Sequence, residues 1–541
     1  MSSATPHSDT PRDTPRVRRL PLAGVLRLGR PSDIWFKPAL SVVVAVAPPN
    51  LTLLALGRLD LAMYTMAGSL CALYAHNRPY AARARALAWV VLGMVAGLGA
   101  GLLAASLTGS AVVLVTVGAL VAAVQKALCD ATRIGPPGHV VLTFISSASL
   151  FAPQTLAQVP GHLALALATG AWAWLVGMAP GVFRPHGPER RATARALDAA
   201  AVYAGNPGSR ASATAHAAVQ AAWQTLLSAG ARSGTRRALE RLVVRAEVAL
   251  AAPADADPDR LRTWARDLRG TAPVPQAPDD DELLGVEIQL AAPAHPVWPV
   301  LAPIAVRTAV GCALAGYASL ALGVGRPYWA LVTAASLYQA NVTLTWSRGV
   351  QRVVGNVVGV LVFAAVVPLA HLGPAALVLC CLALNFGAEA LIARNYWLGS
   401  VCVTPMALLI TEFAGHQEPG RLITERVLDT LVGALVGFAA AVAVTNRRAG
   451  DRVEQSLAAV ERAREHTARL LSEPHPAPGA LDSARRALAT ALVDLRACVE
   501  AASGEWWQRA LPQERVVRTE QAAHRTLAAT IRYHRAEDAR P

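Results

Sequence analysis

The chain has 541 residues, of which 54% are hydrophobic and only 16% are charged, and its mean hydropathy is +0.36. Soluble proteins carry about a quarter charged residues, so the composition excludes an ordinary soluble protein. The formal net charge of +14 raises the question of nucleic-acid binding, but the arginines lie mainly beside apolar segments and in two polar regions, without interleaved aromatic residues. Basic residues next to apolar segments are typical of membrane topology, and no nucleic-acid partner is expected.

The apolar residues gather into runs close to the roughly 20 residues with which a helix crosses a bilayer. We therefore predict an all-α polytopic membrane protein with about 12 transmembrane helices in two six-helix blocks, together with helical cytoplasmic regions. The expected spans are 38–57, 61–77, 86–106, 110–128, 138–157 and 162–180 in the first block, and 299–322, 328–345, 350–371, 374–393, 397–414 and 424–444 in the second.

Composition divides the chain into five expected parts. Residues 1–36 should form a disordered, basic cytoplasmic tail, because they lack the layout of a cleavable signal. The first membrane block is expected over 37–181 and the second over 298–445. Residues 182–297 are rich in alanine and charged residues at helical spacing and residues 446–541 are amphipathic, so both should be helical cytoplasmic regions.

Basic residues set the expected orientation of the spans. Arg78, Arg83 and Arg85 follow the second span, whereas the links on the opposite side are nearly uncharged. Since cytoplasmic links carry an excess of basic residues, both termini are expected in the cytoplasm, with the chain in the inner (plasma) membrane and membrane lipid around it. In the second block, a short polar link carrying Arg348 and Arg352 is expected on the cytoplasmic side.

The second block contains a repeat. Arg326-Pro-Tyr-Trp329 is echoed by Arg394-Asn-Tyr-Trp397, and Arg352-Val-Val-Gly-Asn-Val-Val-Gly359 by Arg426-Val-Leu-Asp-Thr-Leu-Val-Gly433. Each copy occupies three spans, and because three is odd the second copy enters the membrane from the opposite side. This pattern predicts an inverted repeat, an arrangement that lets a site near the midplane open alternately to either face. The first block matches the second loosely, in order and hydropathy.

Enzymatic chemistry is not indicated. The seven cysteines are scattered without a CxxC, which argues against a zinc site or a disulfide framework. The acidic run 279–282 would suit a cation, but it reads better as the start of a helix. Without a phosphate loop, a metal-ligand spacing or a nucleophile–base constellation, no cofactor, no metal and no enzyme activity are expected.

Three arginines are candidate ligands for an anion. Arg307 lies inside the seventh span, roughly two turns from its expected cytoplasmic end. A charge at that depth is costly unless it faces protein or water, so Arg307 either binds an anion or extends to the interface. Arg352 and Arg426 open their repeated motifs, and they serve either as topological anchors or as part of an electropositive route for organic anions.

Polar residues one turn beyond these arginines are further candidates. Asn356 and Thr430 could bind a carboxylate, or they could join neighbouring helices where glycines mark close packing. Glu389 and Asp429 lie within apolar patterns, where a buried carboxyl group could carry protons, although each has an arginine nearby with which it could pair instead.

The aromatic residues of the repeat begin spans. Tyr328, Trp329, Tyr396 and Trp397 stand where interfacial aromatic belts are expected. The alternative is that their rings stack on an aromatic substrate.

These residues carry a family resemblance. The sequence Arg307, Arg326-Pro-Tyr-Trp-Ala-Leu-Val-Thr333, Arg352-Val-Val-Gly-Asn-Val-Val-Gly359 and Arg426-Val-Leu-Asp-Thr-Leu-Val-Gly433 resembles the fusaric acid resistance (FUSC) family, also called aromatic acid exporters, and YccS-like proteins of bacterial inner membranes. The resemblance covers about 299–445. It implies two six-helix halves, each followed by a cytoplasmic region, and proton-driven export of aromatic carboxylic acids. Many members carry Gly-Thr where this chain has Gly355-Asn356.

The expected function is therefore efflux of a small organic anion across the plasma membrane, coupled to protons. Two alternatives stay open: an organic-anion channel on the same scaffold, and a non-transporting membrane scaffold that recruits partners through its cytoplasmic helices. Whether the protein forms a homo-oligomer also stays open.

Overall fold

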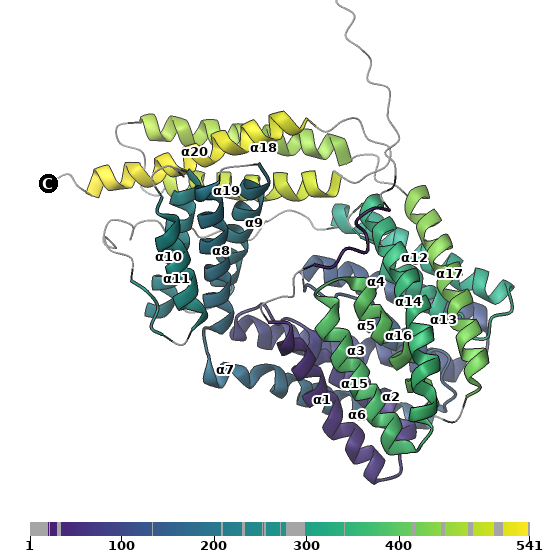
Figure 1. Ribbon diagram of the computed structural model, residues 1–541. Helices are drawn as coiled ribbons and strands as arrows, with labels where there is room; N and C mark the ends of the chain where they lie inside the picture. The colour runs from purple at the N-terminus through teal and green to yellow at the C-terminus, as the bar shows by residue number, and fades with distance from the viewer. Residues whose placement is uncertain are drawn as a thin grey trace, which may run out of the picture.

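The described residues of the computed structural model fold into α-helices joined by short connections (Figure 1). Two predictions concern residues outside the described part of the chain. They are the disordered tail, at residues 1–19, and the helix start at the acidic run 279–282. The structure describes residues 20, 22–29, 34–132, 134–206, 209–229, 233–251, 253, 256–270, 272–276, 298–339, 341–413, 415, 417–444, 449–473, 480–502 and 512–538.

The first apolar group of helices follows a long–short–long order twice. Its second and fifth helices have only about half the length of their neighbours, because short turns replace their ends. The helices are α1 (Phe36–Ala55), α2 (Ala62–Ser69, flanked by 3-10 turns at Leu59–Leu61 and Leu70–Leu73), α3 (Tyr80–Leu107), α4 (Ala111–Thr132), α5 (Val140–Ser149) and α6 (Val159–Met178).

The second apolar group repeats this order. Its helices are α12 (Trp298–Ala321), α13 (Tyr328–Leu337), α14 (Val342–Ala370), α15 (Pro374–Ile392), α16 (Tyr396–Glu412) and α17 (Pro419–Ala443). Within the described residues, eight helices are long and apolar enough to cross a membrane, and four shorter apolar helices lie between them. The chain is a polytopic, all-helical membrane protein, as the sequence predicts.

One predicted boundary is wrong. The expected polar link carrying Arg348 and Arg352 is part of a helix, because α13 ends at Leu337 and α14 begins at Val342. Asn341 starts α14: its side-chain oxygen accepts a hydrogen bond from the backbone N–H of Leu344 at 2.9 Å, which satisfies a free donor of the first turn. Both arginines therefore project from the first three turns of α14.

Packing follows one rule in both groups. The third helix of each three-helix unit packs on the short second helix of the other unit, namely α3 on α5, α6 on α2, α14 on α16 and α17 on α13. Glycines permit the close approach: a Cβ atom at Gly355 would lie 2.7 Å from the carbonyl oxygen of Trp397, and one at Gly433 would lie 2.5 Å from that of Ala330. Such small residues are how membrane helices gain packing contacts.

The two groups also pack against each other in a regular way. α4 contacts α12, α1 contacts α15, and the short helices α5 and α13 lie together. A hydrogen bond of 2.7 Å joins the hydroxyls of Thr116 on α4 and Tyr317 on α12. The first helix of each unit therefore meets a first helix of the other group.

The short helix α7 (Pro180–Phe183) continues α6 and belongs to the same apolar stretch. The other helices form two polar groups, which lie together on one side of the apolar helices in Figure 1. Each has its own apolar core. Helices of the two groups touch, and the rings of His216 and His524 lie 3.9 Å apart. The helices of these groups are α8 (Gly187–Gly205), α9 (Ser209–Leu227), α10 (Gly234–Ala251) and α11 (Pro258–Arg269) before the second apolar group, and α18 (Ala449–Ser472), α19 (Ala480–Ala502) and α20 (Gln513–Asp538) after it.

Candidate functional site

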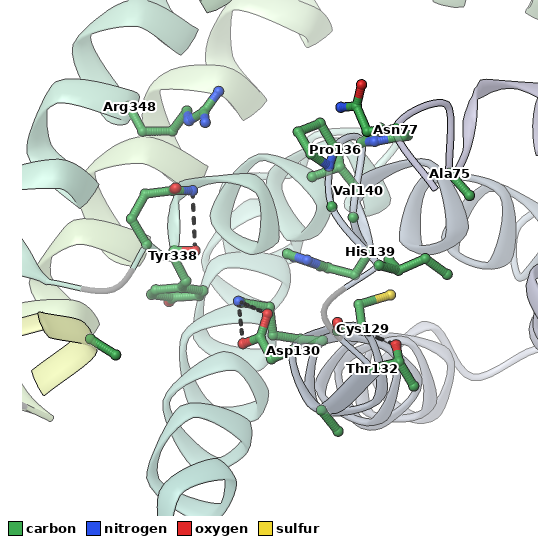
Figure 2. A pocket seen from close by; sticks show the side chains of 18 of the residues that line it. Ala75, Asn77, Cys129, Asp130, Thr132, Pro136, His139, Val140, Tyr338 and Arg348 are labelled. Carbon is green, nitrogen blue, oxygen red and sulfur yellow. Dashed lines mark hydrogen bonds and ion pairs between the residues drawn. The ribbon is translucent and has the colours of Figure 1, made fainter. Parts of the chain in front are cut away.

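A cavity of about 2660 Å³ lies where both apolar groups meet α18 and α19. We call this end of the apolar helices the proximal face and the opposite end the distal face. Figure 2 shows Asp130 and His139 of the first group facing Tyr338 and Arg348 of the second across the cavity. The Lys126 ammonium binds both oxygens of Asp130, at 2.7 and 2.5 Å. The cavity is thus lined by charged and aromatic groups from both halves.

Two arginines of α14 meet one tyrosine at the cavity wall. The Arg352 Nη1 donates a hydrogen bond to the hydroxyl of Tyr396 at 3.1 Å, and the Arg348 guanidinium lies 4.0 Å from the centre of the same ring. Tyr396 is the first residue of α16. The stacked guanidinium and the hydrogen bond concentrate positive charge at the inner edge of the cavity.

One turn deeper, the two copies of the repeated motif touch. The Asn356 Oδ1 accepts hydrogen bonds from the Arg426 Nε at 3.0 Å and from the Thr404 hydroxyl at 2.8 Å. The Arg426 guanidinium also lies 4.0 Å from the centre of the Trp329 ring. Asn356, Arg426 and Trp329 are all buried. We call these three residues the central cluster.

Arg426 carries a charge that the described residues leave partly unmatched. Its side chain is 1% exposed, and its Nη1 has no hydrogen-bond partner in the described structure. The acid one turn along, Asp429, is directed elsewhere: its Oδ1 accepts from the Ser319 hydroxyl at 2.5 Å, while its buried Oδ2 lacks a partner among the described residues. Since a buried guanidinium is costly without a counter-charge, the central cluster is suited to receive an anion.

Aromatic rings wall the cluster on the side of the first apolar group. Trp329 stacks on Phe144 at 5.5 Å, and Tyr328 stacks on Phe151 at 5.8 Å. Tyr328 and Trp329 are themselves 4.8 Å apart. The contact of α5 and the turn after it with α13 therefore places four rings beside a buried cation.

The other candidates have more local contacts. Thr430 donates to the carbonyl oxygen of Arg426 at 2.7 Å on its own helix. Arg307 donates twice, at 3.0 and 2.7 Å, to the carbonyl oxygen of Val444, so it caps the end of α17. Trp397 donates to the N-terminal segment, at the carbonyl oxygen of Leu26, 3.2 Å away.

The predicted candidates fall into three groups. Arg352 and Glu389 line the cavity, and within the described part of the chain the Glu389 carboxyl group makes no hydrogen bond or ion pair. Trp329, Asn356 and Arg426 form the central cluster, with Tyr328, Asp429 and Thr430 next to it. Arg307 and Trp397 lie outside both sets.

Some of the contacting residues had no signal in the sequence. Thr404 and Ser319 are small polar residues in apolar helices and lie outside the repeated motifs, and Phe144 lies in the other half of the chain. Tyr396 was among the predicted aromatic residues at the starts of spans, but its contacts with Arg348 and Arg352 were not predicted. In the described part of the chain, no three His, Cys, Asp or Glu side chains gather closely enough to hold a metal ion.

The distal face is tied by ionic contacts. Glu425 pairs with Arg421 at 2.8 Å and with Arg326 at 3.7 Å. His371 at the end of α14 lies 2.7 Å from the carboxylate of Glu412 at the end of α16. These contacts hold the distal ends of α13, α14, α16 and α17 together.

Comparison with known proteins gives two matches. Residues 312–440, which contain the central cluster, match a family model described as fusaric acid resistance protein-like, and this confirms the family resemblance for that domain. The chain is also 32% identical over 139 residues to "Uncharacterized membrane protein YvaC" of Bacillus subtilis (strain 168), a stretch that covers 25% of this chain and 22% of the relative. No solved structure gives a significant match.

Proposed function

We propose that the protein is a plasma-membrane exporter of aromatic carboxylic acids or related organic anions, driven by the proton gradient. The fusaric acid resistance protein-like domain supports this, since that family is associated with efflux. On this proposal the chain binds and moves its substrate and does not transform it.

The observation that carries the proposal is the buried Arg426. A guanidinium that donates to Asn356 and lies on Trp329 still has a free donor. A carboxylate would supply the missing acceptor in a charge-assisted hydrogen bond, and an aromatic substrate ring could stack against the rings of Trp329 and Phe144. Charged groups inside membrane segments commonly mark such pathways.

The route begins at the cavity. We place the proximal face in the cytoplasm, because Arg78, Arg348 and Arg352 line it and basic residues favour that side. An anion would be drawn in by these charges and pass Tyr396 to reach the central cluster. The ionic contacts at the distal face support a form that is closed to the outside.

We further propose that all four short helices complete a set of twelve spans. On this proposal both membrane blocks are built as inverted repeats, with α12–α14 and α15–α17 as the two copies of the second. The recurring packing of a third helix on the short helix of the other unit supports this symmetry. Short or interrupted helices near a repeat interface are where transporters of this kind bind substrate.

Two carboxyl groups are proposed to carry protons. Glu389 lines the cavity, and Asp429 is fully buried beside Arg426. Glu389 would exchange protons with the cavity, and Asp429 would bind a proton at the depth of the central cluster.

The test is uptake of a panel of aromatic acids into inverted membrane vesicles. Arg426→Gln should lower uptake at least about tenfold, because a charge-assisted hydrogen bond is lost. Arg421→Gln is the matched control: it lies on the same helix, its side chain is 71% exposed, and an exposed ion pair contributes little. Wild-type uptake by Arg426→Gln would contradict the proposal.

The same assay separates the alternatives. Flux that equilibrates without accumulation indicates an anion channel. A folded protein that moves no member of the panel favours a membrane scaffold.

A further inference from the structure

A segment near the N-terminus is bound at the proximal face, although it is remote in sequence. The side-chain amide of Asn395 donates hydrogen bonds to the carbonyl oxygens of Val25 and Arg27, at 3.1 and 3.0 Å. The indole N–H of Trp397 donates to the carbonyl oxygen of Leu26 at 3.2 Å. Three successive carbonyl groups are therefore held by two residues of the second Arg-x-Tyr-Trp motif.

Two further contacts complete the binding. The side-chain amide of Gln351 donates to the carbonyl oxygen of Val25 at 2.9 Å, and the backbone N–H of Gly29 donates to the carbonyl oxygen of Arg394 at 2.9 Å. A Cβ atom at Gly29 would lie 2.9 Å from that same oxygen. A residue with a side chain at position 29 would therefore push the segment away.

Recognition is mainly of the main chain. Val25 is buried, at 8% exposed, whereas Leu26, Arg27 and Leu28 are exposed. The site thus contacts three carbonyl groups, one buried apolar side chain and a glycine of a segment that forms a turn over residues 23–26.

The donors stand at the edge of the cavity. Gln351 lies on α14 between Arg348 and Arg352, and Asn395 and Trp397 flank Tyr396 at the start of α16. The bound segment therefore bridges the two helix ends that meet at the Arg352–Tyr396 hydrogen bond.

The first copy of the motif lacks the hydrogen-bond donors that bind the segment. Pro327 stands where the second copy has Asn395, and it has no amide donor. Trp329, the counterpart of Trp397, is buried in the central cluster. The second copy therefore has donors for binding the N-terminal segment, whereas the first copy does not.

We propose that the proximal ends of α14 and α16 form a peptide-binding site whose ligand is the main chain of residues 25–29 of this same protein. Binding of this segment holds the proximal ends of α14 and α16 in the conformation in which the cavity is formed. The binding site stands on the contacts alone, whereas its part in transport rests on the proposed function.

The binding site is tested by trypsin cleavage after Arg27 in the detergent-solubilised full chain, followed by mass spectrometry of the N-terminal fragments. Asn395→Asp removes both amide donors but keeps the oxygen that accepts from the backbone N–H of Trp397. Trp397→Phe keeps an aromatic ring and removes one donor. We expect cleavage to be faster by about tenfold or more in the first variant and by about fivefold in the second.

Trp172→Phe is the matched control, because the Trp172 indole also donates to a membrane-helix carbonyl, that of Val44, at 3.2 Å. It should leave cleavage after Arg27 unchanged. Wild-type cleavage rates in both Asn395→Asp and Trp397→Phe would overturn the proposal. So would an equal increase in the control, because the effect would then be general loosening.

The fastening role is tested by the apparent KM for export. Asn395→Asp should raise the apparent KM severalfold, because a smaller fraction of the molecules would have the cavity in its binding-competent conformation. Faster cleavage with an unchanged KM would refute the fastening role. Absence of transport by the wild-type protein would instead refute the proposed function and leave the cleavage result standing.

Discussion

Arg426 donates from its Nε to the Oδ1 of Asn356 at 3.0 Å, across 70 positions of sequence. The two residues belong to different copies of the repeated motif, so their contact joins the copies at their centre. The symmetric counterpart would pair Arg352 with Thr430, but Arg352 binds Tyr396 and Thr430 binds its own helix. The Asn–Thr difference between the copies thus gives the two buried arginines different partners, Tyr396 for Arg352 and Asn356 for Arg426.

Removing the acceptor should destabilise the fold. Asn356→Leu leaves the buried Arg426 Nε without a partner, and we expect a loss of about 2–3 kcal/mol. Asn385→Leu is the control, because Asn385 is also buried and, among the described residues, its side chain donates just to the carbonyl oxygen of Cys381 on its own helix. Its cost should be about 1 kcal/mol. Unfolding in detergent measures both, and equal losses would contradict the role given to the Arg426 contact.

The close approach of α14 to α16 predicts a contrast between two glycines. A Cβ atom at Gly355 would lie 2.5 Å from the Ser400 Cβ, whereas one at Gly93 of α3 would meet no atom within 4 Å. Gly355→Ala should cost about 1–3 kcal/mol by overpacking. Gly93→Ala should be neutral or stabilise by up to about 1 kcal/mol through helix propensity. Thermal melting that ranks the two variants the other way would contradict the packing described here.

A buried carboxyl group outside the membrane helices predicts a pH effect. Burial raises the pKa of Glu247 from 4.5 to about 7, against the opposing effects of the hydrogen bond from Trp223 and the charge of Arg485. Because the folded form holds its proton more tightly than the unfolded chain, this contribution to stability is complete below pH 4.5 and is lost as the pH rises through 7. Above that pH the ionised group disfavours folding by as much as about 3 kcal/mol.

Glu247→Gln should remove this dependence, because an amide does not titrate in this range. Hydrogen exchange of α10 in the full chain at pH 5 and pH 8 measures the effect, after correction for intrinsic exchange rates. The wild-type protein should lose protection at pH 8 relative to the variant. Parallel behaviour of the two proteins would contradict the pKa assignment.

The sequence predicted the class of fold well, because bilayer thickness imposes run lengths that are visible in composition. It failed at α13 and α14, where Arg348 and Arg352 were read as a link. Charges can lie within a helix when they face a polar cavity, and the true boundary is set by the cap at Asn341. An asparagine before a helical run was the signal to use.

The sequence also found Asn356, Arg426 and Trp329 as candidates, since a repeated motif draws attention to them. It could not show that Arg426 contacts Asn356 or that Trp397 binds Leu26, because tertiary packing brings these residues together from distant positions. Arg307 was a candidate because of its depth in an apolar run. Its hydrogen bond to the carbonyl oxygen of Val444 explains how a charged side chain is accommodated there.

The central claim is that proton movement drives organic anions through the site at Arg426. It is tested most directly by accumulation of an aromatic carboxylate in inverted vesicles whose interior is made acidic. A permeant weak acid alone would distribute away from an acidic interior. The account predicts accumulation by the wild-type protein and by Asp60→Asn, a control acid with a half-exposed side chain, and its loss in Asp429→Asn. Equal accumulation by all three proteins, or none by the wild-type protein, would contradict the account.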